Sequence, residues 1–304
     1  MAWHCSGTTN QEMVSKLKDA GILTTDRAEA AMLAVDRAKY CHEPDPYLDR
    51  PRNIGYNVTI SAPHMHAYAL SILSDQLFDG AKALDVGSGS GYLSACMGYM
   101  VGSRGHVIGI DHIPELIEMA TKNVREDCTH FLKEGRVKFI VGVGEKKETL
   151  LQIENCKSFF YFFFTYVHTI LKKKLRIQKS EYNIDIMKQD CIHQLRDIAV
   201  HYIKDRPKSN NRLGRAADGP YNAIHVGAAA DVLPEQLIDQ LAPGGRLICP
   251  VVTIEGFRRL QDLLQVDKNI DGTISKKKLM QVSYVPLTDP ATQLLNDTKD
   301  LEKI

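Results

Sequence analysis

The chain has 304 residues, of which 44% are hydrophobic and 25% are charged, and this globular composition excludes a wholly disordered or fibrous protein. Lys and Arg number 38 against 37 Asp and Glu, so no net charge favours nucleic acid or an anionic membrane as a partner. The longest apolar run, residues 159–171, is shorter than the ~20 residues of a membrane span. Seven scattered cysteines without a C-x-x-C pair, and an N-terminus without an apolar stretch, favour the cytosol over secretion.

Helix-like and strand-like patterns alternate along most of the chain. In chain order, the patterns predict helices at 11–20, 25–35 and 66–77, a strand at 83–86, a helix at 92–100, a strand at 106–110, a helix at 114–124, strands at 137–141 and 221–226, a helix at 236–241 capped by Pro243-Gly244-Gly245, and a strand at 246–251. This alternation predicts an α/β fold with a doubly wound, mostly parallel sheet that is covered on both faces.

Residues 145–211 differ from their flanks. These 67 residues contain no glycine, carry 13 basic and 8 acidic side chains, and include the aromatic run at 159–164. A globular segment of this length normally uses glycine at turns and helix ends. We expect a disordered or loosely helical insertion here, either translated non-coding sequence or a genuine isoform segment that forms a helical accessory subdomain.

A glycine-rich segment follows the strand at 83–86. Residues 84–91 read Leu-Asp-Val-Gly-Ser-Gly-Ser-Gly, and the glycines let the main chain turn tightly and approach a ligand. The G-x-G-x-G spacing behind an acidic residue is typical of S-adenosylmethionine-dependent methyltransferases. Asp111, at the end of the next strand, can accept hydrogen bonds from ribose hydroxyls. The alternative is an ordinary strand-to-helix turn, in which Asp85 orders the loop and Ser88 and Ser90 serve as turn residues.

Four segments, one of which contains the glycine-rich segment, resemble one family. Residues 54–67 (IGYNVTISAPHMHA), 83–91, 221–230 (YNAIHVGAAA) and 285–289 (VPLTD) closely resemble protein-L-isoaspartate O-methyltransferases, and the likeness covers 1–144 and about 212–293. It implies a Rossmann-like fold of the class I S-adenosylmethionine-dependent methyltransferase type. It also implies methyl transfer from S-adenosylmethionine to the free α-carboxyl of L-isoaspartyl (and D-aspartyl) residues. The ester then collapses to a succinimide, and partial hydrolysis restores a normal aspartyl link.

The resemblance also implies a set of site residues. Ser61 is expected to hold the carboxylate, and Ile60, Ser61 and Val285 are expected to bind the substrate; for Ser61 alone, a helix N-cap before Pro63 is the alternative. The expected cofactor-binding residues are Val58, Thr59, Ile60, Ser61, His66, Asp85, Gly87, Ser88, Gly89, Ser90, Asp111, His112, Val143, Gly144, Thr288 and Gln293. His64 and His66 could suggest a metal, but no convincing third ligand accompanies them, so no metal is expected.

Two other features of the sequence are discounted. Residues 267–274 match the first half of a calcium-binding loop, but Lys278 occupies the position of the bidentate Glu, so we expect a polar turn between strands. Cys41 and Cys96 have no base placed beside them by sequence, and we expect buried thiols rather than nucleophiles.

The chain departs from the family pattern at three places: Val143 stands where the family has an adenine-binding Asp, Asn222 stands where it has another Asp, and residues 251–256 replace a glycine-rich turn. The expected organisation is a discontinuous methyltransferase domain, 1–144 and 212–304, interrupted by the insertion at 145–211. The expected protein is a monomer whose partners are damaged proteins and peptides that bear isoaspartyl residues. The alternatives are a methyltransferase that acts on a small molecule, and a catalytically impaired isoform that acts as a binding module.

Overall fold

The computed structural model describes residues 5–142, 214–255 and 257–287. The chain divides into two compact units, one of residues 1–142 with 208–304 and the other of residues 143–207, and every described residue belongs to the first unit. The expected insertion at 145–211 lies outside the described residues.

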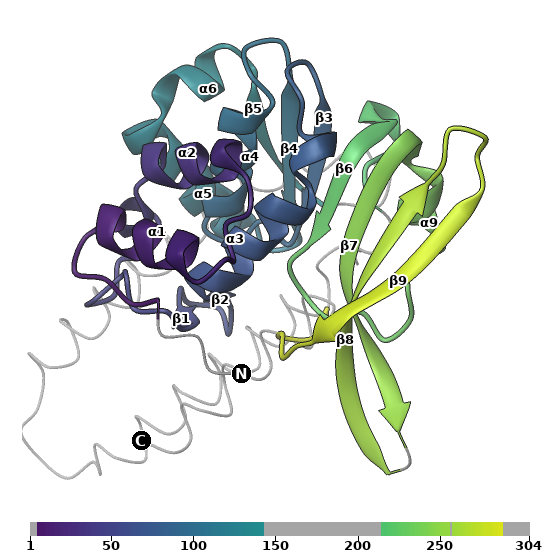
Figure 1. The fold of residues 1–304 in the computed structure, drawn as a ribbon. Coiled ribbons are helices and arrows are strands. Elements are labelled where there is room, and N and C mark those ends of the chain that lie inside the picture. The colour runs from purple at the N-terminus through teal and green to yellow at the C-terminus, as the bar shows by residue number, and fades with distance from the viewer. Residues whose placement is uncertain (1–4, 143–213, 256, 288–304) are drawn as a thin grey trace, which may run out of the picture. The chain divides into compact units, whose positions relative to one another are not determined.

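One sheet of seven strands forms the centre of the first unit (Figure 1). Across the sheet, the strands are β5 (Val137–Val141), β4 (His106–Asp111), β3 (Lys82–Val86), β6 (Tyr221–Val226), β7 (Leu241–Glu255), β8 (Arg258–Lys268) and β9 (Ile274–Gln281). The strands from β5 to β7 pair in parallel, and β8 and β9 pair antiparallel. The prediction of an α/β fold with a mostly parallel sheet is therefore confirmed.

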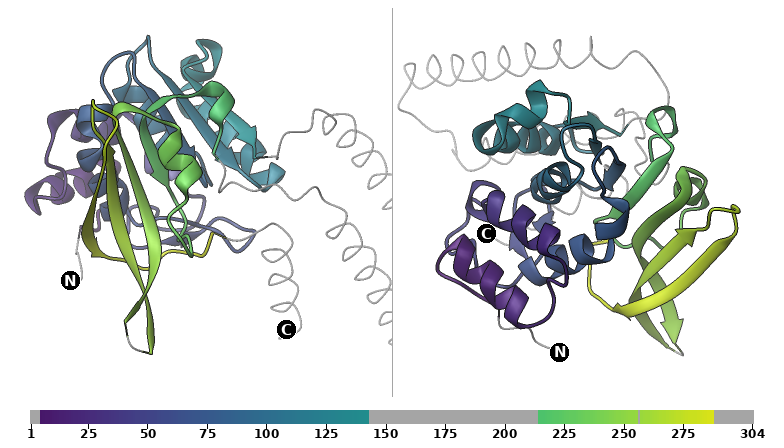
Figure 2. Two further views of the ribbon diagram at one scale, coloured as in Figure 1. Left: turned by 90° about the vertical axis from the view of Figure 1, so that its right-hand side faces the viewer. Right: turned by 45° about the horizontal axis from the view of Figure 1, so that its top comes forward.

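Helices and the two faces of the sheet enclose two hydrophobic cores. The helices are α1 (Asn10–Asp19), α2 (Asp26–Ala34), α3 (Pro63–Ile72), α4 (Tyr92–Met100), α5 (Pro114–Asp127), α6 (Thr129–Lys133) and α9 (Glu235–Asp239). Successive side chains of a strand point to opposite faces, so on β3 Ala83 joins the core that contains residues of α1 to α4, whereas Leu84 joins the core that contains Leu237 of α9. Figure 2 shows α1 to α4 gathered on one side of the sheet.

Most expected elements are present, and α4, β5 and β6 have the expected bounds. The expected helix at 66–77 was placed too late, because α3 begins at Pro63 and ends at Ile72, and a separate turn of 3₁₀ helix, η2 (Ser74–Gln76), follows it. Proline suits the first turn of a helix, where its missing N–H leaves no bond unmade.

The segment Pro243-Gly244-Gly245 does not cap a helix, contrary to expectation. Helix α9 ends at Asp239, and the segment lies inside β7. The pairing of β6 with β7 is irregular at this point, and Gly244 has a positive φ of 79°. The glycines therefore allow the irregular backbone at this point of the strand, where glycine is commonly found.

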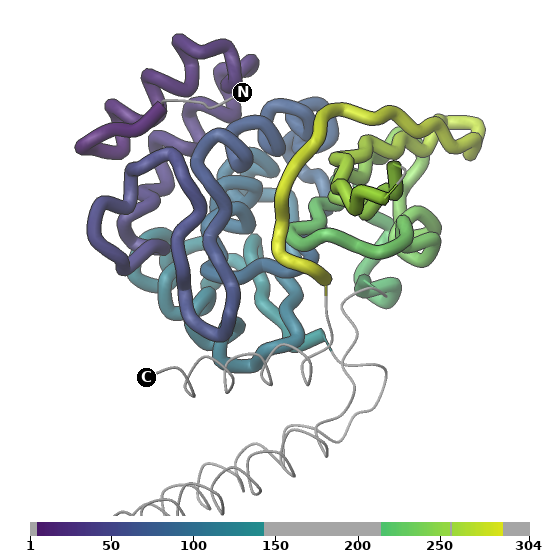
Figure 3. Tube along the Cα trace, turned by 90° about the horizontal axis from the view of Figure 1, so that it is seen from below, coloured from purple at the N-terminus to yellow at the C-terminus, as the bar shows by residue number. Residues whose placement is uncertain are grey.

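Strands β8 and β9 were expected only as unspecified strands on either side of a turn, and their bounds were not predicted. They are joined by a tight turn in which the Gly272 N–H donates to the Asn269 carbonyl at 2.9 Å and the Asn269 N–H donates to the Thr273 carbonyl at 2.8 Å. The prediction of a polar turn between strands is confirmed. After β9 the chain returns across the molecule to run beside residues 228–230, as the yellow segment in Figure 3 shows.

Candidate active site

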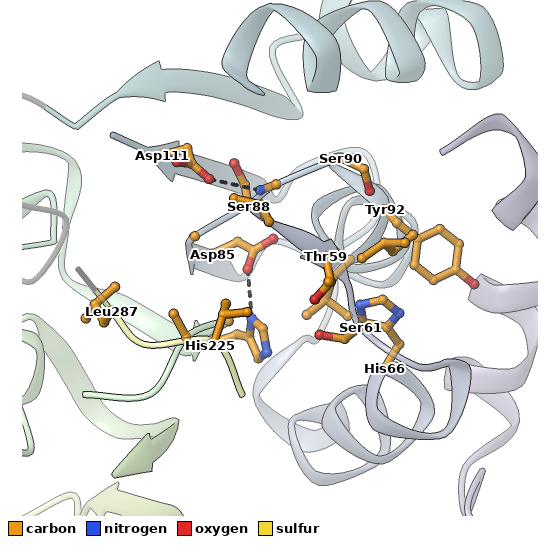
Figure 4. Close-up of a pocket in the computed structure, with 18 of the residues that line it drawn as sticks. Thr59, Ser61, His66, Asp85, Ser88, Ser90, Tyr92, Asp111, His225 and Leu287 are labelled. Atoms are coloured by element: carbon orange, nitrogen blue, oxygen red, sulfur yellow. Dashed lines mark hydrogen bonds and ion pairs between the residues drawn. The ribbon is translucent and has the colours of Figure 1, made fainter. Parts of the chain in front are cut away.

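A pocket lies at the carboxyl ends of β3, β4 and β6 (Figure 4). β3 lies between β4 and β6, and the chain continues from β3 to β4 and β5 on one side but to β6 and β7 on the other. In open α/β sheets, ligands bind outside the carboxyl ends of the strands where the strand order reverses in this way. Its position therefore marks the pocket as the candidate active site.

The glycine-rich loop, which follows β3, forms one wall of the pocket. Gly87, Gly89 and Gly91 have positive φ angles of 79°, 51° and 84°, a conformation that glycine adopts without steric cost. The N–H groups of Gly87 and Ser88 donate to the Ile110 carbonyl at 2.9 and 3.1 Å. Gly91 is also the N-cap residue of α4. The loop is thus fixed to the end of β4 and leads directly into a helix N-terminus, the kind of site that favours anionic and polar ligand groups.

Asp111 is the last residue of β4 and is buried in the pocket wall. One of its carboxylate oxygens accepts the Gly89 N–H at 3.2 Å, and the other accepts the Ile113 N–H at 3.3 Å. Burial raises the pKa of Asp111, and the nearby His112 opposes that shift. Each carboxylate oxygen has a second lone pair, so Asp111 can order the loop and still accept a hydrogen bond from a ligand hydroxyl.

Asp85 lies on β3, is 1% exposed, and makes two side-chain contacts. Its Oδ2 accepts the Ser94 hydroxyl of α4 at 2.6 Å, and its Oδ1 lies 2.8 Å from Nδ1 of His225, its partner across the β3–β6 pairing. Because a carboxylate only accepts hydrogen bonds, this contact places a proton on Nδ1 of His225. Figure 4 shows this pair on one side of the pocket.

A short hairpin supplies another part of the pocket lining. Strands β1 (Arg52–Asn53) and β2 (Thr59–Ile60) pair antiparallel. Tyr56 and Asn57 have φ angles of 55° and 53° in the turn between them, where they take the left-handed conformation that tight hairpins need. The hairpin directs residues 58–61 into the pocket lining. Ala62 is the N-cap residue of α3 and no side chain caps this helix, so the alternative reading of Ser61 as the N-cap is wrong.

His66 of α3 lies between two buried side chains. Its ring is 5.0 Å from the Tyr92 ring, and its Nδ1 lies 3.3 Å from Nη1 of Arg37. Burial is the main cause that holds the pKa of His66 well below its usual value, and the nearby Arg37 guanidinium is the second cause. His66 is therefore neutral at physiological pH.

The structure brings the predicted residues together wherever it describes them. The pocket lining contains Val58, Thr59, Ile60, Ser61, His66, Asp85, Gly87, Ser88, Gly89, Ser90, Asp111, His112 and Val285. Val143, Gly144, Thr288 and Gln293 lie outside the described residues.

Seven residues of the pocket lining were not predicted from the sequence as site residues. These are Tyr92, Leu93, His225, Gly227, Ala228, Pro286 and Leu287. The Ala229 N–H donates to the Val285 carbonyl at 2.9 Å, and the Leu287 N–H donates to the Ala229 carbonyl at 2.7 Å. These bonds hold the segment after β9 beside the segment after β6. The segments containing His225 and Val285 were both recognised, so their positions relative to the strand ends could have pointed to their neighbours.

The two histidines of the His-x-His pair have different partners. His64 Nδ1 lies 2.7 Å from Asp49 Oδ1, whereas His66 contacts Arg37. Within residues 5–142, 214–255 and 257–287, no group of three His, Cys, Asp or Glu side chains is arranged to hold a metal ion. Cys41 and Cys96 are buried free thiols, as expected, and burial raises the pKa of Cys96.

The residues of the pocket fit S-adenosylmethionine. The Ser88 hydroxyl is buried and has no hydrogen-bond partner within the described part of the chain, and a buried hydroxyl left unpaired is costly. A ligand in the pocket could supply that partner. Gly87 and Gly89 leave the main chain open to close approach, and Asp111 offers lone pairs to ribose hydroxyls.

Comparison with known proteins gives a consistent result. The family model for protein-L-isoaspartate(D-aspartate) O-methyltransferase matches residues 8–147 and 167–292. A protein-L-isoaspartate O-methyltransferase of Caenorhabditis elegans is 38% identical and is aligned over 96% of this chain and 98% of its own length. Protein-L-isoaspartate O-methyltransferase 1 of Arabidopsis thaliana is 40% identical over 95% of each chain.

A crystal structure from Plasmodium falciparum, described as a beta-aspartate methyltransferase in complex with S-adenosyl-L-homocysteine, is 29% identical. It superimposes with a TM-score of 0.62 and covers 93% of this chain and 99% of its own. With the pocket at the switch point of the sheet, these matches show that the chain belongs to the protein-L-isoaspartate(D-aspartate) O-methyltransferase family and that its cofactor is S-adenosylmethionine.

Proposed function

We propose that this chain repairs damaged proteins by methylating the free carboxyl group of L-isoaspartyl and D-aspartyl residues, with Ser61 as the residue that holds the reacting carboxylate. The observation that carries the proposal is the composition of the pocket lining, which joins residues 58–61 to the glycine-rich loop at 87–90. The lining therefore contains residues that suit the cofactor and others that suit a carboxylate.

The reaction needs orientation more than acid–base catalysis. A carboxylate is already ionised at neutral pH, and S-adenosylmethionine supplies a methyl group on a sulfonium centre that leaves as a neutral thioether. The chain's task is to place one carboxylate oxygen in line with the methyl carbon. The Ser61 hydroxyl can donate one hydrogen bond to the carboxylate, and the adjacent main chain of Thr59 and Ile60 can shape the entrance.

The glycine-rich loop, Asp111 and, from α3, His66 are assigned to the cofactor. We assign the ribose of the cofactor to Asp111 and its methionine part to His66. The main chain of Gly87, Ser88 and Gly89 is assigned to the bound cofactor as a whole. The unpaired Ser88 hydroxyl and the buried Asp111 carboxylate support this assignment. Val285 is assigned to the substrate side, where it borders the pocket.

A paired-peptide assay tests the proposal. The full chain is supplied with S-adenosylmethionine labelled on the methyl group and with two peptides that differ only in an aspartyl or isoaspartyl link. Base-labile label is expected on the isoaspartyl peptide. Equal labelling of both peptides would contradict the substrate assignment, and labelling of small carboxylic acids in preference to either peptide would favour a small-molecule methyltransferase.

We also propose that the protein is a cytosolic monomer. The described residues that line the pocket all belong to one chain, which supports a site formed within one copy. Cys5, Cys41, Cys96, Cys128 and Cys249 are all free thiols, as is usual in a reducing compartment. No helix in the described ranges is long and apolar enough to span a bilayer. Light scattering of the purified chain tests the oligomeric state.

A further inference from the structure

Arg37 is a fully buried cation in the turn η1 (Arg37–Lys39), with 0% of its surface exposed. Within the described residues, no carboxylate forms an ion pair with it. Burying a guanidinium without a paired carboxylate is costly. The contacts that it makes in compensation therefore indicate what it does.

The guanidinium contacts three separate segments around the pocket. Its Nε donates to the Pro46 carbonyl at 2.8 Å and its Nη2 donates to the Ser61 carbonyl at 2.9 Å. Its Nη1 lies 3.3 Å from Nδ1 of His66. The rigid planar fork of arginine suits such a set of acceptors, whereas the single ammonium of lysine does not. Arg37 thereby joins the segment before β1, the end of the hairpin and helix α3.

The contact with His66 decides which ring nitrogen of the imidazole carries the proton. Arginine has donors and no acceptor, so Nδ1 of His66 must accept and the proton must lie on Nε2. The Tyr92 ring fixes the pair further, since it lies 5.0 Å from the His66 ring and 5.6 Å from Cζ of Arg37. The last distance is within the range of a cation–π contact. His66 lines the pocket and Arg37 does not, so Nδ1 is turned toward the protein interior.

We infer that Arg37 is a positioning residue for methyl transfer: it holds the Ser61 main chain at the pocket and keeps His66 in the Nε2–H form, as a hydrogen-bond donor at the pocket wall. The consequence for the rate rests on the function proposed above for Ser61. The consequence for the tautomer of His66 does not depend on any substrate.

Nitrogen-15 NMR of the imidazole rings tests the tautomer on the full chain without a methyl acceptor. The spectrum of His66→Gln identifies the signals of His66. We expect His66 to be a single Nε2–H tautomer in the wild type and a mixture of tautomers in Arg37→Met, which lacks a side-chain donor. A wild-type Nδ1–H signal, or an unchanged His66 spectrum in Arg37→Met, would overturn the inference whether or not the protein methylates isoaspartyl peptides.

Arg27 provides a matched control for the kinetics. It also donates to three main-chain carbonyls, those of Ser74, Leu77 and Met100, but none of these residues lines the pocket. At a temperature where thermal melts show both variants folded, Arg37→Lys is expected to lower kcat on the isoaspartyl peptide at least tenfold. Arg27→Lys is expected to stay within twofold of the wild type. Equal losses of kcat in both variants, or wild-type kcat in Arg37→Lys, would contradict the role of Arg37.

Discussion

The two walls of the pocket are built by different means. The wall at β3 and β4 consists of a glycine-rich loop whose main-chain N–H groups bond to Ile110 and to Asp111, so neighbouring elements of one sheet fix its shape. The wall at the hairpin and α3 depends on Arg37, whose contacts with Ser61 and His66 span 24 and 29 residues of sequence. The first wall is therefore encoded locally, whereas the second needs a buried side chain from elsewhere in the chain.

Two histidines of the pocket lining, His66 and His225, differ in which ring nitrogen carries the proton. His66 accepts from a buried cation on Nδ1, whereas Nδ1 of His225 faces the buried Asp85 carboxylate at 2.8 Å. A donor beside Nδ1 moves the proton to Nε2, whereas an acceptor beside Nδ1 keeps the proton on Nδ1. Arg37 therefore places the proton of His66 on Nε2, whereas Asp85 places the proton of His225 on Nδ1.

The largest expected effect comes from the hairpin wall. Ser61→Ala removes the hydroxyl assigned to the carboxylate, and we expect kcat on the isoaspartyl peptide to fall about 10²-fold, the usual size of a loss of alignment. The dissociation constant for S-adenosylhomocysteine should change less than threefold, because Ser61 is assigned to the acceptor. Calorimetry and steady-state kinetics on one preparation measure both. A large loss of S-adenosylhomocysteine affinity would place Ser61 on the cofactor side instead.

The opposite pattern is expected for the β4 wall. Asp111→Ala removes the acceptor assigned to the ribose and loosens the loop at Gly89, so binding of S-adenosylhomocysteine should weaken about tenfold to a hundredfold, as for a lost charged hydrogen bond. At saturating S-adenosylmethionine, kcat should be reduced much less. Wild-type affinity in Asp111→Ala would show that the ribose lies elsewhere.

Gly91 tests the local encoding of the loop. A Cβ at this position would lie 2.9 Å from Cζ of Phe139 and 3.0 Å from Cβ of Ala120. Gly21 also has a positive φ, 69°, but nothing lies within 4 Å of its ideal Cβ. Gly21→Ala should cost roughly 1–2 kcal/mol of unfolding free energy from its conformation alone, and Gly91→Ala roughly 1–3 kcal/mol more from overpacking. Equal costs in urea titrations would mean that the loop yields to the extra methyl group.

The smallest expected effect is on the pH dependence of stability. The pKa of His66 is held below the ordinary value of 6.5 by burial and by Arg37, so below pH 6.5 the unfolded chain binds a proton that the folded chain resists. The contribution of this neutral histidine is present above pH 6.5 and is lost as the pH falls. The unfolding free energy of His66→Gln should therefore decline less between pH 7 and pH 5 than that of the wild type. Parallel declines in denaturant titrations would contradict a buried neutral His66.

The sequence was sufficient for the locally encoded parts of the molecule. The order of strand, glycine loop, helix, strand and Asp111 predicted the β3–β4 wall, because each feature lies within one unit of parallel strands. The resemblance to the family named Ser61 and His66. The pair of Asp85 with His225 was not predicted, because these residues are 140 positions apart and meet only through the β3–β6 pairing. The role of Arg37 was not predicted either, because a single arginine produces no periodic pattern in the sequence.

The bounds of β9 could not be predicted from the sequence for a different reason. β9 carries Lys276, Lys277 and Lys278 in succession, so no alternation of apolar and polar residues is visible there. Lys278 nevertheless lies 2.8 Å from the buried carboxylate of Asp262 on β8. The strand is thus stabilised by pairing and by an ion pair with its neighbour rather than by an apolar face, which sequence periodicity does not detect.

The most direct test of the two-wall account is a crystal structure of the full chain with S-adenosylhomocysteine and an isoaspartyl peptide. We expect the ribose hydroxyls to bond to Asp111 and the isoaspartyl carboxylate to lie within hydrogen-bond distance of the Ser61 hydroxyl, with one of its oxygens facing the sulfur of the cofactor product. A carboxylate bound away from Ser61, or a cofactor product bound away from the loop at 87–91, would contradict it.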